Sequence, residues 1–188
     1  ASWFASGSLS LLSYADRLFH IPYQLFFTGM LQIFFTYWAD AYSTQTPEDF
    51  RVKSRRDIRN IFFIALLVSG VLYIARTPLV RGVYGFGDFQ AEDFRLIASL
   101  FGWYILGYAP AVLILLYFRA LFVLKKSHVF CIHSWVRMIL NIIFNFLFIR
   151  IWGLMGIAIA TFVVNCVAAI LLYRYLKSYW NNLEKGSS

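Results

Sequence analysis

The stretch from Gly7 to Phe26, GSLSLLSYADRLFHIPYQLF, decides how the rest of the chain is interpreted. It contains an adjacent acid and base, Asp16 and Arg17, which lead directly into a run from Leu18 to Ala39 that carries no formal charge. In a helix that rises about 1.5 Å per residue, about 20 apolar residues cross the hydrocarbon core of a bilayer. The sequence therefore predicts an ion pair at the mouth of a membrane span, where ionisable groups are costly and usually functional.

The composition of the whole chain indicates an integral membrane protein. Of its 188 residues, 61% are hydrophobic, 20% are aromatic and only 14% are charged, whereas about a quarter of the residues in a soluble domain are charged. The apolar residues also fall in blocks rather than in an amphipathic period. These features favour an all-α fold whose helices cross the bilayer.

The blocks predict five complete transmembrane helices in one helical lobe over residues 18–180. The expected spans are about 18–39, 61–80, 96–118, 136–150 and 151–173. Residues 1–17 are expected to hold the end of a preceding transmembrane helix and a turn, and residues 181–188 a flexible tail. The short hinge IRIWGLMG leaves room only for a tight hairpin between the last two spans.

The positions of the basic residues predict the orientation of the lobe. Twelve of the 17 Lys and Arg residues lie in the loops 40–60 and 119–137 and in the C-terminal segment, and five lie on the other side. Cytoplasmic loops carry the excess of Lys and Arg in membrane proteins. We therefore expect both loops and the C-terminus to be cytoplasmic. Because the basic residues lie between apolar runs, the net charge of +8 does not predict binding to nucleic acid.

Arg17 has two interpretations from the residues alone. A guanidinium group pairs bidentately with phosphate, and this pairing is strengthened where water is scarce. Arg17 could equally be an interfacial anchor that reaches toward lipid headgroups with Asp16 as its partner.

Two polar pairs lie at a spacing of four residues in the last two spans, Asn141 with Asn145 and Thr161 with Asn165. This spacing places each pair on one helix face. Their oxygens could coordinate a small hard cation, or the two pairs could form interhelical hydrogen bonds. The histidines and cysteines lack metal-ligand spacing, and no span carries paired acids or a nucleophile with a base, so neither a metal site nor an enzyme is predicted.

The segment SGSLSLLSYADRLFHIPYQLF resembles the signature of the MviN/MurJ lipid II flippase family, a branch of the MATE-like MOP exporters. The likeness continues in order through TPEDF, PLVRGVYGFGDFQAED and RIWGLMGIAIAT. This family consists of fourteen-helix transporters with two six-helix lobes and a C-terminal helix pair. The resemblance implies that the chain is most of the second lobe, and that a missing N-terminal lobe of the same transporter is its partner.

The resemblance also implies roles for individual residues. Arg17, with Asp16 and His20, matches the cavity site for the lipid pyrophosphate. In the sodium-binding members of the family, the ligand positions correspond to Asn141, Asn145, Ile157 through its carbonyl group, and Thr161. No cofactor is implied, and a sodium ion or the membrane potential would couple transport to energy.

The predicted function is thus transport in the bacterial cytoplasmic membrane. The protein would flip a polyprenyl-pyrophosphate-linked saccharide, lipid II, which is a peptidoglycan precursor, by alternating access among membrane lipids. One alternative cargo is another lipid-linked glycan, such as an O-antigen or exopolysaccharide precursor. Another alternative is a membrane module that transports nothing and docks an enzyme through the basic segment Arg51–Arg59.

Overall fold

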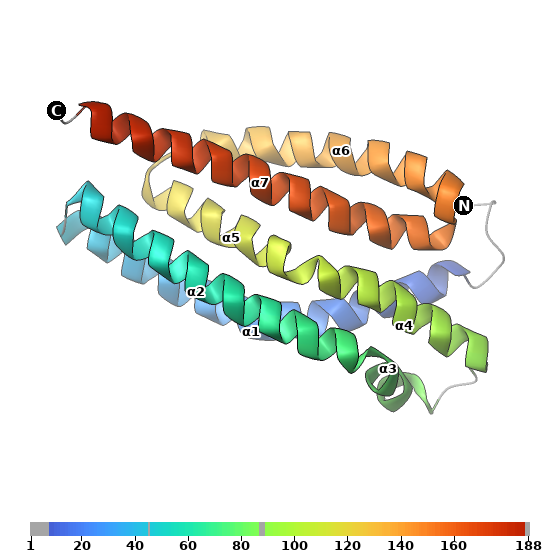
Figure 1. The fold of residues 1–188 in the computed structure, drawn as a ribbon. Helices are drawn as coiled ribbons and strands as arrows, with labels where there is room; N and C mark the ends of the chain where they lie inside the picture. The colour runs from blue at the N-terminus through green and yellow to red at the C-terminus, as the bar shows by residue number, and fades with distance from the viewer. Residues whose placement is uncertain (1–7, 45, 87–88, 187–188) are drawn as a thin grey trace.

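The computed structural model describes residues 8–44, 46–86 and 89–186, and within them the chain is helical apart from short connections. The helices, in chain order, are α1 (Ser8–Thr44), α2 (Pro47–Ile74), α3 (Arg76–Tyr84), α4 (Ala91–Leu106), α5 (Tyr108–Val123), α6 (His128–Trp152) and α7 (Leu154–Gly186). They form an elongated bundle in which successive long helices run up and down (Figure 1). The all-α fold predicted from composition is confirmed.

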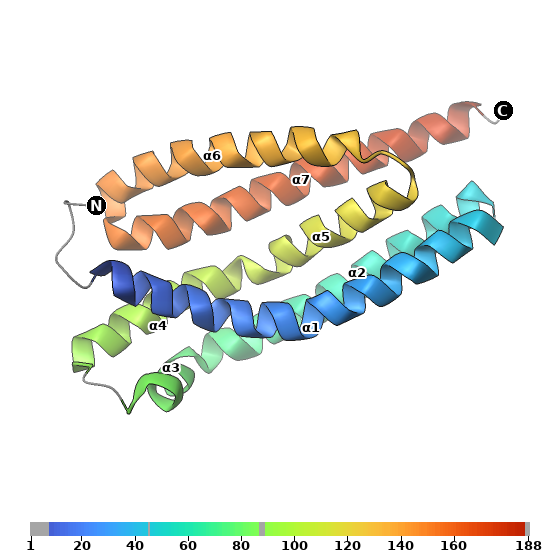
Figure 2. The same cartoon turned by 180° about the vertical axis from the view of Figure 1, so that it is seen from behind.

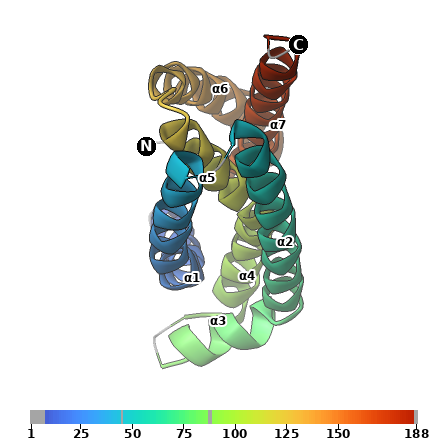
Figure 3. The same ribbon diagram turned by 90° about the vertical axis from the view of Figure 1, so that its left-hand side faces the viewer.

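The helix pair α4 and α5 forms the centre of the bundle. Seen end-on, this pair lies between α1 and α2, with the α6–α7 hairpin on one side and α3 on the opposite side (Figure 3). In the most apolar window of Ala91–Val123, 67% of the residues are buried, against 6% in the corresponding window of α6. The core therefore lies around α4 and α5, whereas α6 shows most of its apolar surface to the exterior.

Four helical stretches in the described part of the chain are long and apolar enough to cross a membrane. They are Glu48–Ile74, Ala91–Val123, His128–Trp152 and Leu154–Asn181. They agree with the second to fifth predicted spans. The first predicted span lies within α1, whose 37 residues exceed the roughly 20 that a helix needs to cross a bilayer.

Several predicted boundaries differ from those in the structure. The helix α1 begins at Ser8, so residues 8–17 continue into the span instead of forming a turn, and the expected end of a preceding helix lies outside the described residues. The predicted tail from 181 is helical to Gly186. The predicted loops 40–60 and 119–137 are also mostly helical. Charged residues mark where a helix leaves the membrane, not where the helix ends.

The start of α2 follows its sequence signal. Thr46 is the N-cap, and its side-chain oxygen accepts a hydrogen bond of 3.2 Å from the backbone N–H of Asp49. Glu48 and Asp49 lie in the first turn, where acidic side chains interact favourably with the helix dipole. This cap fixes the point at which the chain reverses direction after α1.

The third predicted span is broken at Gly107, between α4 and α5. Pro110 lacks a backbone N–H and therefore cannot complete the helical hydrogen bonds of this region. Neighbouring helices bond the carbonyl groups around the break: Ser69 of α2 donates to Ile105, and Asn165 of α7 donates to Gly107 over 3.4 Å. Irregular backbone at membrane depth requires such partners.

The predicted hairpin between the last two spans is confirmed (Figure 2). Gly153 separates α6 from α7 with φ of 58° and ψ of −135°, a conformation that residues with a Cβ rarely adopt. Three residues later, the backbone of Gly156 lies against α6. A Cβ atom at this position would lie 2.2 Å from the carbonyl oxygen of Phe148. Both glycines are therefore required by the geometry of the hairpin.

Candidate functional site

Arg17 lies on the exposed side of α1. Its neighbours Ala15, Leu18 and Phe19 are buried in the core, while the Arg17 side chain is exposed and forms no hydrogen bond or ion pair with the described residues. Burial raises the pKa of the Tyr84 phenol in α3, and the positive charge of Arg17 acts in the opposite direction. Arg17 is thus a free cation near the junction of α1 and α3.

The hydroxyl group of Tyr84 holds this junction together. It donates a hydrogen bond of 2.9 Å to the backbone carbonyl of Tyr14. The rings of Tyr14, Tyr84 and Phe89 also pack against one another, with centroids 5.1 to 6.0 Å apart. The part of α1 that carries Arg17 is therefore fixed on α3 and on the segment that precedes α4.

The expected ion pair between Asp16 and Arg17 is not formed. Asp16 instead contacts His20, whose Nδ1 lies 2.9 Å from the Asp16 carbonyl oxygen and 3.4 Å from the carboxylate oxygen Oδ2. Adjacent residues on a helix point about 100° apart, whereas residues four apart share a face. The contact with Asp16 fixes His20 and leaves the Arg17 guanidinium available to a ligand.

Arg17 belongs to a polar face that runs along the first half of α1. We call this the α1 polar face; its exposed members recur every three or four residues, namely Ser10, Ser13, Arg17, His20 and Gln24. A membrane helix presents apolar side chains to lipid, and its polar side chains face a water-filled cavity or another part of the protein. The face indicates that this side of α1 does not contact acyl chains.

The four candidate cation positions lie on the packed helices α6 and α7. Asn145 donates a hydrogen bond of 2.7 Å to the side-chain oxygen of Asn141, and the Thr161 hydroxyl donates one of 3.0 Å to the Ile157 carbonyl. Both of these bonds remain within one helix, so Asn141, Asn145 and Thr161 form no interhelical hydrogen bond with the described residues. The Asn145 side-chain oxygen is buried and has no hydrogen-bond partner among the described residues.

Asn165 forms interhelical hydrogen bonds, which was one of the two interpretations of the polar pairs. Its side-chain oxygen accepts a hydrogen bond of 2.8 Å from Arg137 of α6, while its amide group reaches Gly107. Arg137 was expected in the basic loop 119–137, but it lies in α6, and its contact with Asn165 was not predicted. A signal was present, because Arg137, Asn141 and Asn145 continue one row at a spacing of four residues.

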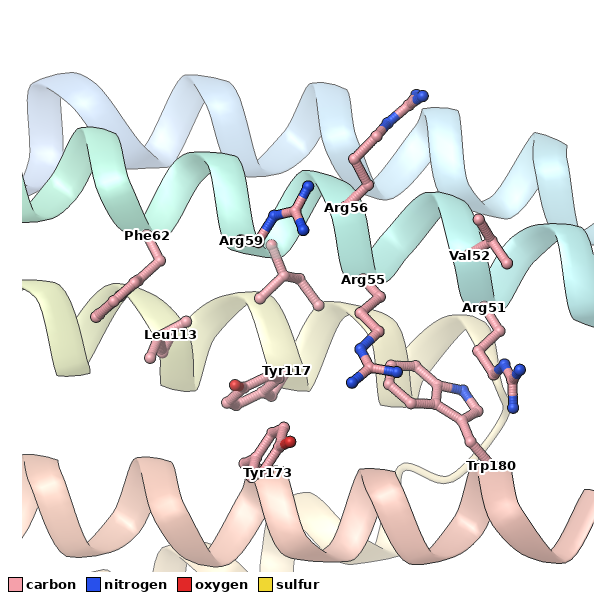
Figure 4. A pocket seen from close by; sticks show the side chains of 11 residues that line it. Arg51, Val52, Arg55, Arg56, Arg59, Phe62, Leu113, Tyr117, Tyr173 and Trp180 are labelled. Carbon is pink, nitrogen blue, oxygen red and sulfur yellow. The ribbon is translucent and has the colours of Figure 1, made fainter.

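A basic pocket lies between α2, α5 and α7 (Figure 4). It involves the start of α2, at the end of the bundle opposite to the first part of α1, which carries Arg17 (Figure 1). Its volume is about 700 Å³. The residues that line it are Arg51, Val52, Arg55, Arg56, Ile58, Arg59, Phe62, Leu113, Tyr117, Tyr173 and Trp180. The arginines of this pocket were expected in a loop. Only the fold shows that they lie on one helix, α2, and line a pocket.

Comparison with known proteins agrees with the resemblance found in the sequence. Residues 1–186 match the sequence model of the family described as "Lipid II flippase MurJ". A protein named "Probable lipid II flippase MurJ" from Bdellovibrio bacteriovorus is 25% identical, over 95% of this chain and 34% of its own length. A "Lipid II flippase MurJ" from Burkholderia cenocepacia is 22% identical, over 94% of this chain and 34% of its own.

A solved structure titled "Lipid II flippase MurJ, inward closed conformation" has the same fold. It superposes with a TM-score of 0.84 at 22% identity and covers 94% of this chain and 37% of that chain. The chain therefore spans about a third of the length of the curated relatives that it matches. Because the family match extends over almost every residue, the chain belongs to the lipid II flippase MurJ family.

Proposed function

We propose that the protein that contains this chain flips lipid II across the cytoplasmic membrane by alternating access. The chain supplies part of the second lobe, and a first lobe lies against the α1 polar face. The observation that carries the proposal is that face, with the free guanidinium of Arg17 at its centre. A polar row on a membrane helix, together with membership of the family, supports a cavity between lobes.

Arg17 has the chemistry that a pyrophosphate headgroup requires. A guanidinium group presents several N–H donors in a planar fork, and this fork matches two phosphate oxygens at once. Asp16 and His20 lie beside it and bond each other, so they limit the space around Arg17 without neutralising it. Transport of this kind makes and breaks no covalent bond, and the polyprenyl tail stays in the bilayer while the headgroup crosses the cavity.

The proposed orientation places the α1–α2 connection, the α5–α6 connection and the C-terminus in the cytoplasm. All three lie at one end of the bundle, and the first part of α1, which carries Arg17, lies toward the other end (Figure 1). The excess of basic residues at the first end supports this orientation. In intact cells, we expect a membrane-impermeant thiol reagent to react with a Phe86→Cys variant and not with a Lys125→Cys variant. The reverse labelling pattern would overturn the orientation.

Energy coupling would use either a sodium ion or the membrane potential. A sodium ion would be held by oxygens of Asn141, Asn145, Ile157 and Thr161, and the unpartnered oxygen of Asn145 suits a cation ligand. All four groups are neutral, so the positive charge of a bound sodium ion would not be compensated by these ligands. Transport that is unchanged when potassium replaces sodium would exclude the sodium site and leave the membrane potential as the driving force.

Arg17→Ala in the full-length protein is the variant that tests the proposed site. We expect it to abolish rescue of a strain depleted of its own lipid II flippase, because no other described group beside it offers a free cation. Arg17→Lys should rescue partially, since an ammonium group keeps the charge but loses the bidentate geometry. Arg174→Ala, at an exposed position of α7, is the control and should rescue fully.

Normal growth of the Arg17→Ala strain, at a normal protein level, would contradict a role for Arg17 in binding the headgroup. The cargo is tested in the same cells. Rescue of an O-antigen or exopolysaccharide flippase mutant, without rescue of the lipid II flippase strain, would assign the protein to the other glycan.

A further inference from the structure

The basic pocket contains two arginines whose charge nothing in the described part of the chain balances. Arg51 pairs with Glu48 at 2.6 Å, and Arg56 lies 3.8 Å from Asp57. Arg55 and Arg59 form no ion pair or hydrogen bond with the described residues. They lie four positions apart on α2, so their side chains leave the same helix face.

An unsatisfied donor lies on the opposite wall of the pocket. Trp180 of α7 is only 7% exposed, and its indole N–H has no hydrogen-bond partner among the described residues. A buried donor without an acceptor destabilises the folded state. The side chain lies across the pocket from α2, beside Arg51 and Arg55 in the close view (Figure 4). The pocket thus offers two cations and one N–H donor to a ligand that supplies only acceptors.

The other part of the pocket is apolar. Ile58, Phe62 and Leu113 line it, and they lie on the side where α2 continues into its uncharged run from Ile61 to Ile74. A ligand that fills the whole pocket would therefore need a charged end and a hydrocarbon part.

The pocket lies where the helices pass from apolar to charged sequence. On α2 the change comes after Arg59, and on α7 it comes at Tyr173, beyond which Arg174 and Lys177 follow. A smaller cavity beside the pocket adds Lys177 to the same cluster. Tyrosine, tryptophan and basic residues at this position are typical of the headgroup level of a membrane. Basic pockets between helices at this level bind anionic lipid headgroups.

We propose that this pocket binds an anionic glycerophospholipid from the cytoplasmic leaflet. Arg55 and Arg59 hold the phosphate diester, the Trp180 N–H donates to one of its oxygens, and an acyl chain lies along Ile58, Phe62 and Leu113. A soluble phosphate would satisfy the charged groups and leave the apolar wall uncovered. The site is separate from Arg17, which lies toward the opposite end of the bundle, and it involves no lipid-linked sugar.

Binding can be measured on the intact protein that carries this chain, in phosphatidylcholine nanodiscs with increasing phosphatidylglycerol. Native mass spectrometry counts the phosphatidylglycerol molecules that stay bound. We expect Arg55→Gln with Arg59→Gln to lower the affinity of the tightest site roughly 30-fold, the effect of two basic groups at a membrane surface. Lys125→Gln with Arg174→Gln removes the same charge from the same end of the bundle, outside the pocket, and should change the affinity less than threefold.

A second measurement locates the lipid without relying on the arginine variants. Phosphatidylglycerol with brominated acyl chains should quench the fluorescence of Trp180. The part of the quenching that is absent in a Trp180→Phe variant belongs to this residue. Brominated phosphatidylcholine should quench that component much less. The proposal would be overturned if the Arg55→Gln, Arg59→Gln variant and its control retained phosphatidylglycerol equally. It would also be overturned if both brominated lipids quenched Trp180 equally. Displacement of the lipid by millimolar glycerol phosphate would overturn the lipid assignment and indicate a site for soluble phosphate.

Discussion

Arg17 shows how far single residues could be interpreted from the sequence. Its side chain is exposed and has no partner among the described residues, so the expected pairing with Asp16 is not formed, while its role in binding an anion stays a prediction. The adjacent letters suggested an ion pair, whereas the helix places Asp16 beside His20 at a spacing of four residues. The contact with Asp16 accounts for the position of the His20 side chain.

Asn165 is a residue for which burial gives a prediction about stability. It is 3% exposed and bonds both Arg137 and the carbonyl group at the α4–α5 break. Asn165→Leu leaves both groups without this partner, and we expect a loss of about 1–2 kcal/mol, which lies at the upper end of values for polar contacts in membranes. The effect is measured as a lower thermal unfolding temperature of the variant, compared with the unchanged protein, in detergent.

Thr161→Val is the matched control for Asn165→Leu. Among the described residues, the Thr161 hydroxyl bonds only the Ile157 carbonyl of its own helix, so removal of the hydroxyl should change the unfolding temperature little. Equal destabilisation by the two variants would show that the Asn165 contacts do not hold the break.

At the scale of elements, the sequence predicted what local chemistry determines. The hairpin at Gly153 was predicted, and the cap at Thr46 follows a local signal in TPEDF, because short-range chemistry fixes both features. The break at Gly107 was not predicted as a division of the span. Gly107 and Pro110 allow a break, but the contacts from Ser69 and Asn165 that support it come from helices distant in sequence.

The contact between α6 and α7 at Gly156 gives a prediction for one element pair. Gly156→Ala places a Cβ atom 2.2 Å from a backbone oxygen of α6, so the hairpin must open, and we expect a loss of about 1–3 kcal/mol in unfolding free energy. Gly70→Ala is the control, since a Cβ there meets no atom within 4 Å. Alanine is the better helix former, so this variant should be neutral or slightly more stable. If both variants have the same unfolding temperature, the close approach does not limit the packing.

For the whole molecule, the sequence predicted one helical lobe and the order of its spans, but not which helices form its core. The order of apolar blocks and basic segments indicated spans that cross the membrane in alternating directions. It could not show that α4 and α5 fill the centre while α6 stays exposed, because both stretches are similarly apolar. It also could not show that Arg55, Arg59 and Trp180 line one pocket, since three helices must meet to form it.

Movement of the headgroup between leaflets is the most direct test of the central claim, that the Arg17 side of α1 carries a lipid pyrophosphate across the membrane. Proteoliposomes of the full-length protein with labelled lipid II in the inner leaflet allow this movement to be followed by an added enzyme that cleaves only outward-facing headgroups. We predict that the unchanged protein makes the label cleavable over time and that Arg17→Ala remains at the rate of protein-free vesicles. Equal rates for Arg17→Ala and the unchanged protein would contradict the claim.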